Sequence, residues 1–248
     1  MVWAGAKDKI ARLEGEEMKS LGIIGGTSWE STLEYYRLIN EGVRDALGGL
    51  HSARIVLASV DFQGYADDMA SGRWENVEAG LLGETDRLVA AGIDAILIAS
   101  NTLHAYAESV SGRAALPFLH IADATGSAIE KTGARRVALL GTRYAMEKGF
   151  YQERLKKRFG VEALIPEEAD RLEINRIIFD ELCVGVFLES SKRRLLEIIR
   201  RMEGDGIEAV ILGCTELPLL VKKSDLDLPL LDTLGLHAAQ AVEFLLAK

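Results

Sequence analysis

The feature that most constrains the fold is a gapless repeat. Residues 91–102 read AGIDAILIASNT and residues 205–216 read DGIEAVILGCTE. In each copy a short aliphatic run ends in a small residue, which is followed by Ser100 in the first copy and by Cys214 in the second. Such a repeat predicts two similar lobes, each presenting one side chain from the end of a strand. Ser100 and Cys214 are therefore the candidate reaction centre.

Strand and helix patterns alternate along the chain from residue 19 onward. Aliphatic runs predict strands, and amphipathic spacing predicts the helices between them. Strands are expected at 19–24, 54–60, 95–99, 116–121, from 136, at 160–165, in the second repeat copy and near 228–231. Helices are expected at 29–47, at 74–91, in a segment entered through 122–125, up to 157, at 173–183, 190–204 and from 233. This order predicts an α/β fold of two pseudo-symmetric doubly wound lobes, each with a mostly parallel sheet and with the active-site cleft between them.

The same patterns give provisional domain boundaries. Residues 1–18 are charged with mixed sign and are expected to form an N-terminal extension. Residues 19–122 form the first lobe, with Ser100 at a strand end, and residues 123–232 form the second lobe, with Cys214. Residues 233–248 are expected to form a closing helix that packs back on the first lobe.

Charge and cysteine content narrow the class of partner and the compartment. A formal net charge of −9 argues against nucleic acid or an anionic membrane as partner. The chain has only two cysteines, and Cys183, in a helical pattern, is expected in the core. Without a disulfide framework, a signal peptide or an apolar run of about 20 residues, we expect a cytoplasmic protein.

Two strand-end segments in the first lobe leave alternatives open. The turn Gly25-Gly26-Thr27-Ser28 suits an anion site formed by backbone amides, or is simply a tight turn that caps the next helix. It matches neither a Walker loop nor a complete GxGxxG fingerprint. Asp61, which follows the second strand, is equally consistent with a site residue and with a helix cap.

The chemistry of the candidate pair follows from its two residue types. A cysteine at the end of a parallel strand favours a reactive thiol over a structural one, because side chains leave the core there and helix N-termini lower a thiol pKa. Groups on opposite faces of one carbon suit proton removal on one face and return on the other. A serine hydroxyl is a much weaker base without a partner, and His104 is more consistent with a structural role.

At these residues the chain resembles the aspartate/glutamate racemase family. The resemblance runs from about residue 19 to the C-terminus and is carried by GGTSWEST, LGGLHSA, SVDF, SNTLH, LPFLHIADAT, LLGTRYAM and GCTEL. It implies an isomerase of two pseudo-symmetric α/β lobes that works without cofactor or metal, using paired cysteines in a cleft. It also implies a small amino-acid substrate and a homodimer.

The resemblance also assigns roles to individual residues. Cys214 matches the second family cysteine, which acts as base and acid on one face of the substrate. Ser100 stands where the family has its first cysteine, as in a subgroup of L-aspartate/glutamate-specific racemases that carries threonine there. Thr27, where many relatives have methionine, is the second departure. The candidate substrate-binding residues are Thr27, Ser28, Asp61, Asn101, Thr102, Thr215 and Glu216.

Ser100 admits three accounts: a natural enzyme with one strong base that works asymmetrically, an engineered replacement of a cysteine, or a protein that has lost racemisation. We expect a cofactor-independent racemase for aspartate, glutamate or a similar polar amino acid, with Cys214 as the main base and acid. The alternatives are a one-cysteine decarboxylase or isomerase of the same fold, and a catalytically inactive amino-acid-binding protein.

Overall fold

The computed structural model describes residues 18–247. The chain divides into two compact units. Among the described residues, unit 1 contains 18–99, Tyr106–Leu119 and 237–247. Unit 2 contains Ser100–Ala105 and His120–Leu236.

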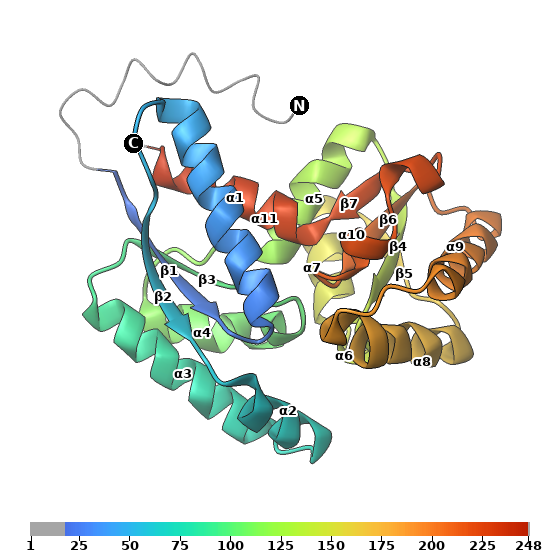
Figure 1. The fold of residues 1–248 in the computed structure, drawn as a ribbon, viewed down its shortest axis with the longest axis horizontal. Helices are drawn as coiled ribbons and strands as arrows, with labels where there is room; N and C mark the ends of the chain where they lie inside the picture. The colour runs from blue at the N-terminus through green and yellow to red at the C-terminus, as the bar shows by residue number, and fades with distance from the viewer. Residues whose placement is uncertain (1–17, 248) are drawn as a thin grey trace. The chain divides into compact units, whose positions relative to one another are not determined.

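Unit 1 is built on a three-stranded parallel sheet. Its strands are β1 (Ser20–Gly25), β2 (Arg54–Ser59) and β3 (Ala95–Ile98), in the order β2-β1-β3. All side chains of β1 and β3 are buried, as a strand covered on both faces requires. Helices cover the two faces of this sheet (Figure 1). Helix α1 (Trp29–Leu47) lies on one face, and α3 (Trp74–Ala90) and α4 (Ala107–Ala114) lie on the other. The helices contributing to unit 1 are α1 (Trp29–Leu47), α2 (Phe62–Ala70), α3 (Trp74–Ala90), α4 (Ala107–Ala114) and the part of α11 (Thr233–Leu245) from His237 onward.

Unit 2 is built on a four-stranded parallel sheet in the order β5-β4-β6-β7. Alternate residues of its central strand enter two separate cores, because successive side chains of a strand point to opposite faces. Val137 and Leu139 pack with α5 (Ile121–Thr132) and α7 (Phe150–Phe159), whereas Ala138 and Leu140 pack with α8 (Glu168–Arg176) and α9 (Glu189–Gly204). The elements are β4 (Arg136–Gly141), β5 (Glu162–Leu164), β6 (Ala209–Gly213), β7 (Leu230–Asp232), α5 (Ile121–Thr132), α6 (Arg143–Glu147), α7 (Phe150–Phe159), α8 (Glu168–Arg176), α9 (Glu189–Gly204) and α10 (Leu217–Leu220).

The α/β class and the parallel sheets predicted from the sequence are confirmed, with local corrections. The strand expected at 116–121 is a single bridge between Ile96 and Phe118, and α5 already begins at Ile121. The helix expected up to residue 157 is divided into α6 and α7, because Gly149 adopts a left-handed conformation with φ of 77°. The sequence analysis assigned no helix to the residues of α2.

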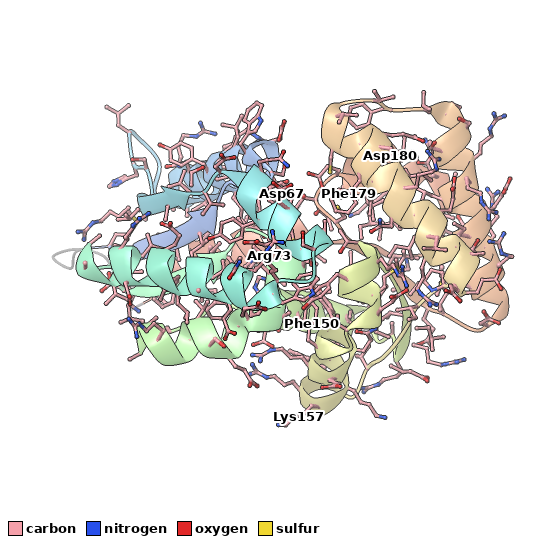
Figure 2. All side chains as sticks on the ribbon, turned by 90° about the horizontal axis from the view of Figure 1, so that it is seen from below. Asp67, Arg73, Phe150, Lys157, Phe179 and Asp180 are labelled. Atoms are coloured by element: carbon pink, nitrogen blue, oxygen red, sulfur yellow. The ribbon has the colours of Figure 1, made fainter. Side chains whose placement is uncertain are left out.

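The helix expected at 173–183 is also interrupted. After α8 the chain forms a π-helical turn, η3 (Ile177–Glu181), and a 3₁₀ turn, η4 (Leu182–Val184). The wider turn changes which side chains face the core. Leu182 is buried, whereas Phe179 and Cys183 are exposed, so the prediction of a core position for Cys183 is wrong. Phe179 and Asp180 are labelled on this segment in Figure 2.

Two glycines allow the strand ends to approach neighbouring backbone. Gly26 has a φ of 92°, and a Cβ there would lie 2.2 Å from the carbonyl oxygen of Val60. Gly213, directly before Cys214, pairs with Gly141, and a Cβ on Gly213 would lie 2.9 Å from the Leu140 carbonyl oxygen. The repeat has a small residue before Cys214 because β4 and β6 come together there.

Within residues 18–247, no helix combines the length and apolar character needed to cross a membrane.

Candidate active site

The candidate site in unit 2 lies at the carboxyl edge of its sheet. Gly141 pairs with Gly213, and Leu212 pairs with Asp232. The residues that follow these positions, Thr142, Cys214 and Thr233, therefore leave the sheet at the same edge. Ligands of open parallel sheets bind at this edge.

The segment that contains Ser100 joins this edge. Its residues Ser100–Ala105 belong to unit 2, although β3 belongs to unit 1 and the repeat predicts Ser100 in the first lobe. The hydroxyls of Thr102 and Thr142 lie 2.9 Å apart, and the Asn101 amide nitrogen donates to the Thr233 hydroxyl at 3.0 Å. These side-chain bonds connect the residues after β3 to those after β4 and β7. The structure thus brings both members of the predicted pair into one unit.

Cys214 is held beside a buried carboxylate. Its thiol donates to Oε2 of Glu216 at 3.0 Å, and the Thr215 hydroxyl donates to the same oxygen at 2.7 Å. Cys214 and Glu216 are both more than nine-tenths buried. Burial, followed by the negative charge of Glu216, raises the pKa of the Cys214 thiol well above its usual value. This direction is opposite to the lowered thiol pKa expected beside a helix N-terminus, and the thiol has a proton acceptor in contact.

Ser100 occupies a different environment. Its side-chain oxygen is positioned to accept from the backbone N–H of Leu103 at 3.4 Å, at the start of the 3₁₀ turn η2 (Thr102–Tyr106). Its carbonyl oxygen lies 2.6 Å from Nδ1 of His104. Because the backbone N–H of Ile121 donates to Nε2 of the same ring, Nδ1 must carry the proton and donate to the Ser100 carbonyl. The ring has no acceptor nitrogen left for the Ser100 hydroxyl, so His104 holds the backbone here.

Asn101 is a buried polar residue of this segment, at 5% exposure. Its amide nitrogen is bonded to Thr233, whose hydroxyl donates to the Leu212 carbonyl at 2.9 Å. Its amide oxygen is buried and has no hydrogen-bond partner among the residues that the structure describes. An acceptor left in this way is suited to a ligand that offers N–H.

Three predicted site residues lie in unit 1. The Thr27 hydroxyl is buried and has no hydrogen-bond partner within residues 18–247. Ser28 caps α1, where its side chain accepts from the Ser31 backbone N–H at 3.2 Å. Asp61 caps α2, accepting from the Gln63 backbone N–H at 3.2 Å, so the structure shows the helix-cap alternative. Substrate binding by these three residues stays a prediction.

Two residues at this edge, Thr142 and Thr233, were not among the predicted site residues. The signal for Thr142 was present, because VALLGT in the second lobe repeats the LGIIGGT pattern of the first. Thr233 follows a short last strand and carries no motif of its own. Among the described residues, no group of three or more His, Cys, Asp or Glu side chains is arranged to hold a metal ion.

The chain has two α/β units, each built on a parallel sheet, and a thiol–carboxylate pair at the end of a strand. It is therefore an α/β protein with a polar site at the carboxyl edge of a sheet. A family model described as Asp/Glu/Hydantoin racemase matches residues 24–241, so the chain belongs to this family.

Solved structures and curated proteins agree with this assignment. A candidate Asp/Glu racemase from Yersinia pestis is 44% identical over 93% of this chain and 100% of its own, with a TM-score of 0.87. An aspartate racemase homologue from Pyrococcus horikoshii OT3 is 35% identical over 92% of this chain and 99% of its own, with a TM-score of 0.79. A glutamate racemase from Aquifex aeolicus is 28% identical over 134 residues, which are 53% of this chain and 50% of that protein. Membership of the family supports amino-acid racemase activity.

Proposed function

We propose that the protein racemises aspartate, glutamate or a similar polar amino acid without a cofactor. The observation that carries this proposal is the contact between the Cys214 thiol and the Glu216 carboxylate at the end of β6. A thiol removes an α-proton only as a thiolate, and Glu216 is within hydrogen-bond distance to take the thiol proton. Family membership supplies the reaction class.

The proposed proton transfers balance in three steps. The Cys214 proton moves to Glu216, leaving a thiolate. The thiolate then takes the α-proton of the bound amino acid, which leaves a carbanion whose charge spreads into the α-carboxylate. In the third step the Ser100 hydroxyl returns a proton to the opposite face of the α-carbon, which inverts the configuration and leaves the serine oxygen deprotonated. The proton held by Glu216 then reaches this oxygen through solvent, which restores the starting site.

Ser100 is the group we assign to the second face. Its oxygen is positioned to accept the Leu103 amide proton, and the His104 ring is occupied by backbone bonds. The serine hydroxyl is therefore equipped to donate a proton and poorly equipped to remove one. This asymmetry leads us to propose that racemisation starting with proton removal on the Ser100 face is slow.

The remaining candidates are assigned to substrate binding. We propose that Asn101, Thr102 and Thr215 contact the α-carboxylate and α-amine of the substrate, with Glu216 also facing the bound amino acid. Thr27, Ser28 and Asp61 are proposed as further substrate contacts. The cytoplasmic location and the homodimer also remain proposals.

Ser100, which stands in place of a second cysteine, leaves open the alternative of a one-cysteine decarboxylase or isomerase. A panel of L- and D-amino acids, led by aspartate and glutamate, is incubated with the protein and analysed by chiral chromatography, beside malonates and maleate. We expect formation of the opposite enantiomer from at least one polar amino acid. Turnover of a malonate or maleate without racemisation would favour the alternative. Binding of an amino acid by calorimetry without racemisation or solvent exchange would indicate an inactive binding protein.

A further inference from the structure

The Thr233 hydroxyl determines which way the Asn101 amide faces. Thr233 is fully buried at the junction of β7 and α11. Its hydroxyl has a single proton, and the Leu212 carbonyl 2.9 Å away can only accept. The hydroxyl therefore donates to Leu212 and must accept from its other partner, Asn101. Only the amide nitrogen of Asn101 can donate, so the amide oxygen has to point away from Thr233.

This orientation leaves a fixed acceptor in the site. The Asn101 oxygen is buried and without a partner among the described residues, so an N–H group of a ligand would satisfy it. The Glu216 carboxylate, at the same sheet edge, is also an acceptor. Two acceptors at one edge suit the ammonium group of an amino acid better than a carboxylate.

We infer that Thr233 is a positioning residue that fixes the Asn101 oxygen toward the α-ammonium group and thereby selects amino acids over analogues without the amine. The inference rests on the proposed function for the identity of the ligand. Without the Thr233 hydroxyl, the Asn101 amide is free to turn over and present its NH₂ group. The inverted amide repels the ammonium group and favours a carboxylate.

The test compares two substitutions of this residue. Thr233→Val keeps the shape of the side chain and removes both hydrogen bonds, whereas Thr233→Ser keeps the hydroxyl. Thr85→Val is the matched control, because Thr85 is also fully buried and its hydroxyl donates to a backbone carbonyl, that of Leu81 in unit 1. The probes are L-glutamate against glutarate and L-aspartate against succinate, measured by isothermal titration calorimetry. Circular dichroism checks that each variant is folded.

We expect the unaltered protein and Thr233→Ser to prefer the amino acid of each pair. Thr233→Val is expected to lose about tenfold or more of that preference, the size of a hydrogen bond to a charged group. In α-proton exchange, Thr233→Val should raise KM more than it lowers kcat, and Thr85→Val should change neither.

An unchanged preference in folded Thr233→Val would overturn the inference, and so would equal losses in the Val and Ser variants. Failure of the proposed function is distinguishable from these results. If the protein exchanges no α-proton but loses its preference for the amine in Thr233→Val, the positioning role stands and the racemase does not. If exchange depends on Cys214 while the preference ignores Thr233, the racemase stands and the positioning role fails.

Discussion

At the scale of single residues, the proposed mechanism depends on Cys214 being a much stronger base than Ser100. Cys214 is a buried thiol bonded to a carboxylate, and Ser100 is a hydroxyl positioned to accept from an amide in a turn. Both residues were found from the repeat, because strand-end positions follow directly from periodicity. Their hydrogen bonds could not be read from the sequence, since Glu216, Leu103 and His104 acquire their orientation only in the folded turns.

Replacing Ser100 by cysteine should restore the missing base. A thiol becomes a thiolate far more readily than a hydroxyl becomes an alkoxide, so Ser100→Cys is expected to speed the slow direction of racemisation by about tenfold or more. Initial rates from each enantiomer by chiral chromatography provide the measurement. Ser111→Cys is the control, because Ser111 is also partly buried but lies in α4 of unit 1. Equal rates for Ser100→Cys and the unaltered protein would mean that Ser100 does not limit turnover.

Replacing Glu216 by glutamine should make the Cys214 thiol ionise more easily but slow racemisation. Its negative charge is one cause of the raised thiol pKa, so Glu216→Gln should lower the pH at which Cys214 ionises, while burial still keeps its pKa high. Loss of the proton acceptor should nevertheless reduce racemisation by about 10²-fold. The thiolate is followed by ultraviolet absorbance during a pH titration. Cys183→Ser is included in all samples, because Cys183 is exposed and would otherwise contribute. A higher ionisation pH in Glu216→Gln would contradict this assignment.

At the scale of elements, helices and strands with regularly spaced apolar residues could be predicted, whereas elements without such spacing could not. The bounds of α1 and α9 follow from amphipathic patterns, and β3 and β6 from the aliphatic runs of the repeat. The short α2 was missed because it buries none of its residues, and its periodicity is therefore weak. The π-helical turn at Ile177–Glu181 depends on packing around buried Leu182, which local sequence does not specify.

The packing of α8 on α9 depends on one buried carboxylate. Asp170 of α8 accepts from Arg194 at 2.8 Å and also from Arg201, both on α9. Asp170→Asn should lower the free energy of unfolding by about 1–3 kcal/mol, a range reduced because both guanidinium groups are partly exposed to solvent. Urea unfolding measures this change. Asp86→Asn, which breaks an exposed pair with Arg113, should leave the urea midpoint nearly unchanged, and an equal loss in both variants would refute the prediction.

At the scale of the whole molecule, the repeat predicted two similar parts but not how the chain is shared between them. The chain passes between the two units four times, after Ala99, Ala105, Leu119 and Leu236. The first repeat copy is divided in this way: its strand belongs to unit 1, and its last three residues, 100–102, belong to unit 2. Hydrogen bonds of Asn101, Thr102 and His104 to distant residues explain this division, and no local pattern predicts such bonds.

The central claim is that Cys214 exchanges the α-proton of an amino acid. The most direct measurement is incorporation of deuterium at the α-carbon of aspartate and glutamate in deuterated water, followed by NMR, for the unaltered protein, Cys214→Ala and Cys183→Ala. We predict exchange with the unaltered protein and Cys183→Ala, and none above background with Cys214→Ala. Exchange by Cys214→Ala at the rate of the unaltered protein would contradict the account.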